Sequence, residues 1–256
     1  MGDLSDSSDI SGKKIFFLYP TASVVNQVIT ELVQNEYEVY IVKDHKRLVR
    51  VIKKYPNSIL YINIDEGMDK HEWEKWVNTI LVSLKEIKIG IFTVSTDEKL
   101  RNKYVYDLRI SCGYIIQKFD MSGAVTTILE ILDVLNVKGR RKYLRAVTER
   151  ETNATLNIPL NGGYINGGIK DISVAGISCT FKRDPRLKKN ELIKDIQIRL
   201  QSMLLKVEAI VFGCRIDGGD KNYVFLFTQR IDPDVRVKIR RFIQQNLQSK
   251  MDYEIH

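Results

Sequence analysis

The sequence contains few of the residues that build disulfide frameworks, zinc sites or membrane spans. Only three cysteines occur among its 256 residues, Cys112, Cys179 and Cys214. Because they are widely spaced and odd in number, they exclude a disulfide framework or a Cys/His zinc site and suit the reducing cytoplasm. The longest strongly apolar runs, such as 15–19 and 89–94, are far shorter than the roughly 20 residues that span a bilayer. We therefore expect a cytoplasmic protein with no transmembrane helix and no membrane insertion.

Motifs for catalysis and metal binding are also missing. The histidines His45, His71 and His256 are scattered and have no Cys or Ser partner in a recognisable motif. The sequence has no GxSxG, HExxH or Walker loop, the patterns that present a nucleophile, a zinc ion or a phosphate cradle. These absences predict a protein that is not an enzyme and that uses no metal or cofactor.

Charge is plentiful but unevenly distributed. The 40 Lys and Arg and the 32 Asp and Glu give a net charge of +8, and residues 1–138 sum to −1 while residues 139–256 sum to +9. The acidic, Ser-rich residues 1–11 lack the basic and apolar regions of a secretory signal, which predicts a flexible, solvated tail. The basic second half favours an anionic partner such as a nucleotide, nucleic acid or an acidic membrane surface, although a soluble basic domain has the same composition.

Residues 12–137 alternate short apolar runs with stretches of helical period. Trp73, Val77, Ile80 and Leu84, for example, lie on one face of a helix. Mostly apolar strands between helices indicate a parallel sheet covered on both faces. We predict a doubly wound α/β domain with strands at 15–19, 37–42, 59–64, 89–94 and 113–116, and helices at 24–32, 45–54, 73–84 and 124–137.

Residues 138–256 have a different character. Short alternating or β-branched segments are separated by Gly-rich or charged turns, which is typical of a small antiparallel barrel. Asp232-Pro233, an N-cap followed by proline at the first helical position, predicts a final amphipathic helix that packs on the barrel. The glycine pairs at 162–163, 167–168 and 218–219 are interpreted as hairpin turns. The six predicted strands are 155–160, 164–172, 176–181, 192–200, 204–216 and 223–228.

Two short motifs near this change of character point to a ligand. The first is Arg141-Lys-Tyr-Leu-Arg145, an RxxxR extended by Arg140, and the second is Asp171-Ile-Ser173-Val-Ala-Gly176, a DxSxxG. In this order and followed by further strands and a helix, the two motifs resemble those of the PilZ domain, the bacterial receptor for cyclic di-GMP. The resemblance covers about 115 residues from Arg140 onward and implies ligand-binding roles for Arg141, Arg145, Asp171 and Ser173.

The residue types suit that ligand. Cyclic di-GMP carries two phosphates and two guanines, and the planar fork of arginine engages guanine O6 and N7 or a phosphate in two-pronged fashion, which lysine does not. Asp171 is suited to accept from guanine N1 and N2, Ser173 to add a hydroxyl contact, and Gly176 to permit a tight turn or a close backbone approach. The competing interpretation is structural: Asp171 and Ser173 form an Asx or Ser turn, and the arginines form a solvated linker.

The α/β half resembles a response-regulator receiver domain, with departures from its acidic pocket. Asp65 matches the carboxylate after the third strand that accepts phosphate, Thr93 or Ser95 the hydroxyl residue after the fourth, and Lys118 the lysine after the fifth. Phe119 stands where a proline is usual, and Tyr19-Pro20-Thr21 supplies none of the acids that hold magnesium after the first strand. We therefore expect a degenerate interaction module for an unknown protein partner, rather than a domain phosphorylated at Asp65.

The sequence thus predicts a non-enzymatic cyclic di-GMP receptor in which ligand changes the arrangement of the two domains. An alternative is a DNA- or RNA-binding regulator, because the last predicted helix carries Arg236, Lys238, Arg240 and Arg241, and the segment 182–189 is also basic. Few aromatic residues are interleaved with these basic residues, and this disfavours the nucleic-acid alternative. The basic segment 182–189 is most simply a charged loop.

Overall fold

The computed structural model describes residues 12–148, 153–160, 162–217 and 219–255. The predicted N-terminal tail, residues 1–11, and His256 lie outside the described residues. By its internal contacts the chain separates into two units, one formed by Met1–Lys142 with Leu247–His256 and the other by Tyr143–Asn246. The predicted boundaries, 12–137 and 138–256, stay predictions, and each unit is described by itself.

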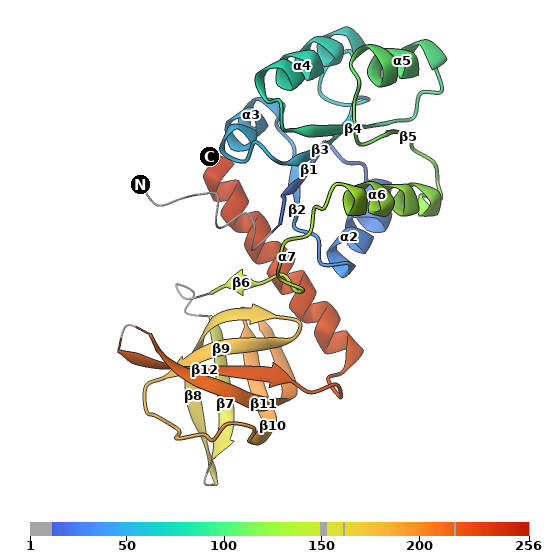
Figure 1. Ribbon diagram of the computed structural model, residues 1–256. Helices are drawn as coiled ribbons and strands as arrows, with labels where there is room; N and C mark the ends of the chain where they lie inside the picture. Colours follow the sequence, from blue (N-terminus) through green and yellow to red (C-terminus); the bar gives the residue numbers. More distant parts are fainter. Residues whose placement is uncertain (1–11, 149–152, 161, 218, 256) are drawn as a thin grey trace. The chain divides into compact units, whose positions relative to one another are not determined.

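The first unit contains the predicted parallel sheet of five strands (Figure 1). The strand order is β2-β1-β3-β4-β5, the order of flavodoxin-type doubly wound folds. This confirms the predicted fold class, and the ends of each strand lie within two residues of their predicted positions. The strands are β1 (Ile15–Leu18), β2 (Val39–Val42), β3 (Ile59–Asn63), β4 (Lys88–Thr93) and β5 (Tyr114–Ile116).

Two of the longer helices of this unit begin at aspartate N-caps. The Asp44 side chain accepts from the backbone of Lys46 and Arg47, and Asp69 forms a capping box with Glu72. The segment 98–107, which the sequence analysis left unassigned, is also helical. The elements are η1 (Val24–Ile29, a π-helical segment), α2 (Thr30–Gln34), α3 (His45–Lys54), α4 (Lys70–Ser83), α5 (Glu98–Asn102), η2 (Lys103–Asp107, π-helical) and α6 (Ser122–Val134).

Alternation along the strands supplies a core on each face of the sheet. Phe16 and Leu18 pack into a cluster with residues of α3, α4, α5 and η2, while Ile15 and Phe17 pack with residues of η1, α2 and α6. All four residues of β1 are buried, as expected for a central strand covered on both sides. Among the described residues, no helix combines the length and the apolar character needed to cross a membrane.

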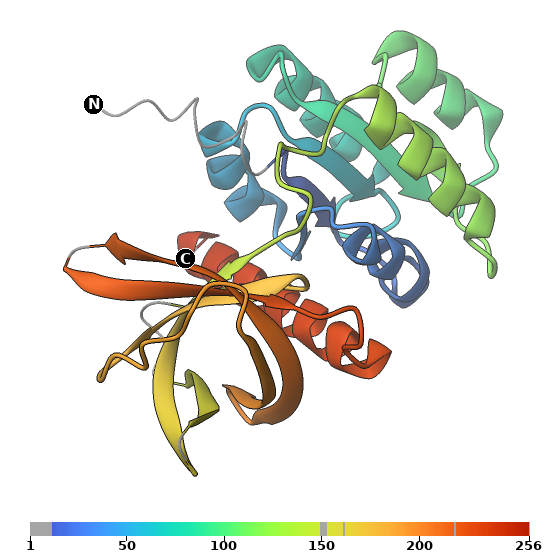
Figure 2. The ribbon, with the colours of Figure 1, turned by 60° about the horizontal axis from the view of Figure 1, so that its bottom comes forward.

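The second unit is an antiparallel barrel of six strands with one short added strand (Figure 2). Its hydrogen-bonded order is β8-β7-β10-β11-β12-β9, and β9 pairs again with β8, so that the sheet closes. The predicted six-stranded barrel is therefore confirmed. Its elements are β6 (Ala146–Val147), β7 (Ala154–Leu160), β8 (Gly163–Ser173), β9 (Gly176–Phe181), β10 (Leu192–Leu200), β11 (Met203–Asp217) and β12 (Asp220–Phe227).

The glycine pair at 167–168 corrects one of the predicted turns. Both residues lie within β8, where Gly167 pairs with Leu156 of β7 and with Phe181 of β9. A Cβ on Gly167 would come within 2.8 Å of the Phe181 ring and of the Thr180 carbonyl oxygen. The pair therefore provides a close approach between neighbouring strands in the closed barrel and is not a hairpin turn.

The last helix, α7 (Pro233–Ile255), starts at the predicted proline and contributes to both units. Ile239, Phe242 and Ile243 are buried within the stretch assigned to the barrel unit. The last ten residues instead belong to the α/β unit, where Met251 joins the core cluster that contains Leu48 of α3. The expectation that this helix packs on the barrel thus holds for its first part and is wrong for its end.

Polar contacts hold the end of α7 against β2, an edge strand of the α/β sheet. The Gln248 side chain accepts from the Ile41 backbone N–H and donates to the Ile41 carbonyl oxygen, both at 2.9 Å. The side-chain amide of Gln248 therefore satisfies the backbone N–H and carbonyl of Ile41 at the edge of the sheet, as a neighbouring strand would. Three residues on, Met251 is buried, so polar and apolar contacts of this helix face act together.

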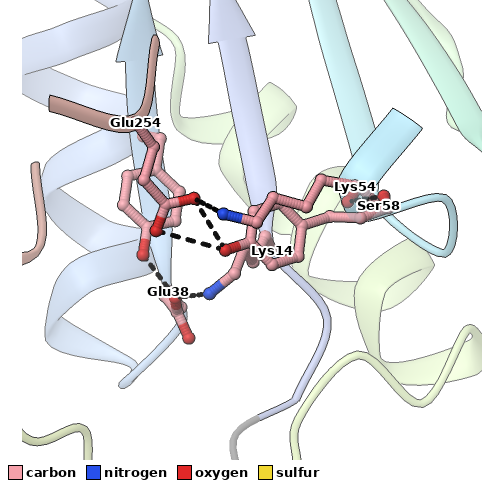
Figure 3. Close-up of polar contacts among 7 residues, drawn as sticks. Lys14, Glu38, Lys54, Ser58 and Glu254 are labelled. Carbon is pink, nitrogen blue, oxygen red and sulfur yellow. Dashed lines mark hydrogen bonds and ion pairs between the residues drawn. The ribbon is translucent and has the colours of Figure 1, made fainter. Parts of the chain in front are cut away.

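A second set of polar contacts lies near the N-terminal ends of strands β1, β2 and β3 (Figure 3). Glu254 of α7 accepts from Lys54 Nζ at 2.7 Å and from the Tyr55 hydroxyl at 3.0 Å. Close by, Lys14 pairs with the buried Glu38, and the Lys14 ammonium lies 4.9 Å from the centre of the Tyr55 ring. Burial alone would raise the pKa of Glu254, but hydrogen bonds from Lys54 and Tyr55 lower this pKa on balance.

Candidate ligand-binding site

A bulge in β8 determines which side chains face outward at the DxSxxG motif. Ile169 pairs with Cys179, but the register then shifts so that Asp171, and not Lys170, pairs with Ser178. One extra residue reverses the faces of a strand. Asp171 and Ser178 therefore share the outer face of the barrel, while Ile172 opposite Ile177 turns into the core.

The two-residue strand β6 brings the motif arginine to this place. Val147 pairs with Asp171, and the Thr148 hydroxyl and backbone N–H each donate to a carbonyl of β8, at 2.7 Å. Arg145, directly before β6, donates from Nη1 to Asp171 Oδ1 at 3.1 Å. The sequence analysis missed β6, because two residues are too few to show any period.

Both carboxylate oxygens of Asp171 have partners within the barrel unit. Oδ1 accepts from Arg145, and Oδ2 accepts from the hydroxyl of Ser178, a residue that is only 4% exposed. The Arg145 side chain keeps 47% of its surface exposed and that of Asp171 keeps 22%. Because a carboxylate has about four acceptor sites, Asp171 retains acceptor capacity toward solvent, and Arg145 retains donors.

Ser173 and Gly176 form the turn that joins β8 to β9. The Ser173 hydroxyl accepts from the Ala175 backbone N–H at 3.3 Å and lies 3.4 Å from the Gly176 carbonyl oxygen, and the residue is buried. A Cβ on Gly176 would come 2.1 Å from the Phe225 carbonyl oxygen. Gly176 thus permits the close approach of β9 to β12, and the Ser173 hydroxyl is engaged in a turn, as the structural interpretation expected.

The remaining arginines of the first motif fall on the other side of the unit division. Arg140 and Arg141 are exposed and belong to the first unit, whereas Arg145 belongs to the barrel. Of the predicted site residues, the barrel unit brings together Arg145 and Asp171, with Ser173 and Gly176 in the adjoining turn. The participation of Arg140 and Arg141 stays a prediction.

The α/β unit has a neutral network where a receiver pocket would hold its metal. The Gln117 side chain accepts from the Thr21 hydroxyl at 2.7 Å and donates to Asn63 Oδ1 at 3.2 Å. Asp65 accepts from the Thr93 hydroxyl and from the Val94 backbone N–H, both at 2.7 Å. Within the described ranges, no group of three His, Cys, Asp or Glu side chains is arranged to hold a metal ion.

The basic loop at 182–189 is organised around one of its own acids. Asp184 accepts from Lys221 Nζ at 2.6 Å, from the Tyr223 hydroxyl and from the Arg186 backbone N–H. The hydrogen bond from Lys221, followed by that from Tyr223, holds the pKa of Asp184 below its usual value. The loop is therefore fixed to β12 through its own acid, Asp184.

Comparison with known proteins gives a match to one family model and to several solved structures. Residues 139–245 match the family model of the PilZ domain. Among solved structures, the PilZ domain of YcgR with c-di-GMP from Escherichia coli shares 17% identity over 44% of this chain and 98% of that chain, with a TM-score of 0.38. The MrkH–c-di-GMP complex of K. pneumonia shares 20% identity over 45% of this chain, with a TM-score of 0.40.

A response regulator from Thermotoga maritima shares 13% identity over 48% of this chain and 98% of that chain, with a TM-score of 0.41. This chain spans only about half the length of several of the proteins it matches, namely 57% of the MrkH chain and 51% of the YcgR chain in complex with c-di-GMP. Residues 139–245 thus match the PilZ family model and contain the closed six-stranded barrel, and a doubly wound α/β unit precedes them.

Proposed function

We propose that this protein is a non-enzymatic cytoplasmic receptor for cyclic di-GMP. The observation that carries the proposal is the Arg145–Asp171 pair on the outer face of the PilZ barrel, which combines a guanidinium fork with a carboxylate that keeps free acceptor sites. Arginine matches the paired acceptors of guanine and the oxygens of phosphate, and Asp171 matches the N1 and N2 donors of guanine. No catalytic group or cofactor is required for such binding.

Arg140 and Arg141 complete the proposed site. They precede Arg145 by five and four residues, respectively, in a segment without helix or strand, so the chain is able to fold around a ligand that carries two phosphates. Ser173 and Gly176 support the site through the turn in which they lie. In this proposal Ser173 acts mainly by holding the end of β8, since its hydroxyl already accepts a backbone hydrogen bond.

Ligand binding, in the same proposal, changes the arrangement of the two units. Arg141 belongs to the α/β unit and Arg145 to the barrel unit. A dinucleotide that engages both has a different affinity for different arrangements, which is the condition for a population shift. The α/β unit then serves as a degenerate receiver-like module for a protein partner.

Isothermal titration of the full chain with cyclic di-GMP tests the receptor function. We expect saturable binding, with cyclic di-AMP, which lacks the guanine N1 and N2 donors, binding at least tenfold more weakly. Replacing Arg141 or Arg145 by alanine removes a charge-assisted contact and is expected to cost roughly 2 to 5 kcal/mol of binding free energy. Heats equal to those of dilution for the wild-type chain would refute the proposal.

Nucleic-acid binding is the second candidate, and the charge of the second half favours it. On α7, Lys238 and Arg241 are exposed, while Arg236 and Arg240 are partly buried, so the helix presents fewer outward charges than its sequence suggests. A gel-shift series in salt separates the candidates, because binding through phosphates weakens steeply as salt rises. Absence of a shift at low salt would eliminate this function.

A further inference from the structure

The DxSxxG motif does not account for the position of its own aspartate. In the barrel unit, Asp171 is flanked by Arg145 on one carboxylate oxygen and by Ser178 on the other. Ser178 lies beyond the motif, on β9, and its hydroxyl is buried below the carboxylate with only 4% of the residue exposed. A carboxylate held at one oxygen by a buried donor has lost the rotational freedom that a solvent-exposed aspartate keeps.

We propose that Ser178 is a positioning residue for ligand recognition, holding Asp171 at the angle at which its free acceptor sites meet the Watson–Crick edge of guanine. This proposal rests on the proposed function. Ser178 does not itself contact the ligand in this account; it acts through Asp171 Oδ2 and leaves Oδ1 shared between Arg145 and the ligand. The β8 bulge is part of the same device, since it alone brings Asp171 opposite Ser178.

Two features separate this role from ordinary packing. First, the Ser178 hydroxyl donates to the charged carboxylate of Asp171 on the adjacent strand β8. The backbone of Ser178 pairs with β8 and β12 independently of this side-chain contact. Second, Thr180 lies two residues farther along β9 on the same face and also carries a hydroxyl, yet it pairs with Gly168, which offers no side-chain acceptor. Thr180 therefore provides a matched control on the same strand.

The expected effect follows from the strength of a hydrogen bond to a charged group. Ser178→Ala frees Asp171 to rotate and is expected to weaken cyclic di-GMP binding about tenfold. Ser178→Thr keeps the hydroxyl on a strand that favours β-branched residues and is expected to stay within about threefold of wild type. Thr180→Ala is expected to bind like wild type. Circular dichroism of each variant verifies that the barrel is folded.

A double-mutant cycle of binding affinities distinguishes a positioning role of Ser178 from a purely structural one. Isothermal titration is carried out on the full-length wild type, Ser178→Ala, Asp171→Ala and the double variant. If Ser178 acts through Asp171, its loss costs about tenfold in the wild-type background and nothing further in the Asp171→Ala background. An equal loss in both backgrounds, or wild-type affinity in Ser178→Ala, would overturn the positioning role. A wild-type chain that does not bind overturns the receptor function instead.

Discussion

At the scale of single residues, the geometry of a donor matters as much as its charge. Arg145 donates to Asp171 from one nitrogen of its guanidinium group, and its side chain stays about half exposed. Lysine at this position would keep the positive charge and lose the two-pronged geometry. In the proposed site, arginine and lysine at position 145 are therefore not equivalent, although they carry the same charge.

Arg145→Lys tests this distinction. We expect binding of cyclic di-GMP to fall by at least tenfold in isothermal titration, most of the loss seen in Arg145→Ala, because the fork and not the charge makes the paired contact. Lys142→Arg, a change of the same size nearby, serves as the control and is expected to leave affinity within about threefold. Full binding by the Arg145→Lys chain would show that a point charge suffices.

Gly176 has a structural role, and its surroundings indicate how its replacement would change the stability of the barrel. A Cβ there would overlap the Phe225 carbonyl oxygen, so Gly176→Ala forces β9 and β12 apart and is expected to destabilise the barrel by about 3 kcal/mol. Gly168→Ala on β8 meets no atom within 4 Å and is expected to leave stability unchanged or slightly raised. Urea unfolding midpoints of the two variants compare them, and equal midpoints would contradict this reading of Gly176.

At the scale of elements, the structure shows what the sequence could and could not predict. The helix predicted at 45–54 has the bounds His45–Lys54, and the structure adds the Asp44 N-cap that fixes its start. The segment 98–107 was missed because only Leu100 and Tyr104 of its residues are buried, too few to display a period. Strand alternation likewise gives no warning of the extra residue at Lys170.

The candidate site was predictable in part for the same reasons. Arg145 and Asp171 stand in recognisable motifs, and the structure brings them within hydrogen-bond distance. Ser178 belongs to no motif, because its pairing with Asp171 depends on the bulge. The turn formed by the Ser173 hydroxyl agrees with the structural interpretation of the motif, but no sequence signal favours that interpretation over ligand binding.

We expect the packing of the end of α7 against the α/β sheet to depend on pH. The folded-state pKa of Glu254 is lowered, so its ionised form favours docking: the contribution is complete above the ordinary pKa, about 4.5, and is lost as pH falls through the folded pKa. We expect the Met251 methyl NMR signal to move toward its exposed position below about pH 4.5. The variant Glu254→Gln, which cannot ionise, should lose most of this dependence, and an identical titration in both chains would contradict the assignment.

At the scale of the whole molecule, the chain connects the barrel unit and the α/β unit at two places. The RxxxR motif divides between the units, and α7 begins in the barrel and ends on the edge strand of the α/β sheet. The chain therefore passes from one unit to the other twice, once before β6 and once within α7.

Small-angle scattering tests the proposed change of arrangement. We expect saturating cyclic di-GMP to narrow the distance distribution of the full chain, because ligand selects one arrangement among several. The Arg141→Ala chain should show no such change at the same ligand concentration. A distribution that is identical with and without bound ligand in the wild type would leave the receptor intact and reject the conformational mechanism.

The most direct test of the central claim is isothermal titration of cyclic di-GMP into the wild-type chain and into the Arg141→Ala and Arg145→Ala chains. The account predicts saturable binding by the wild type and a loss of roughly 2 to 5 kcal/mol in each variant. Unchanged affinity in both variants would contradict it.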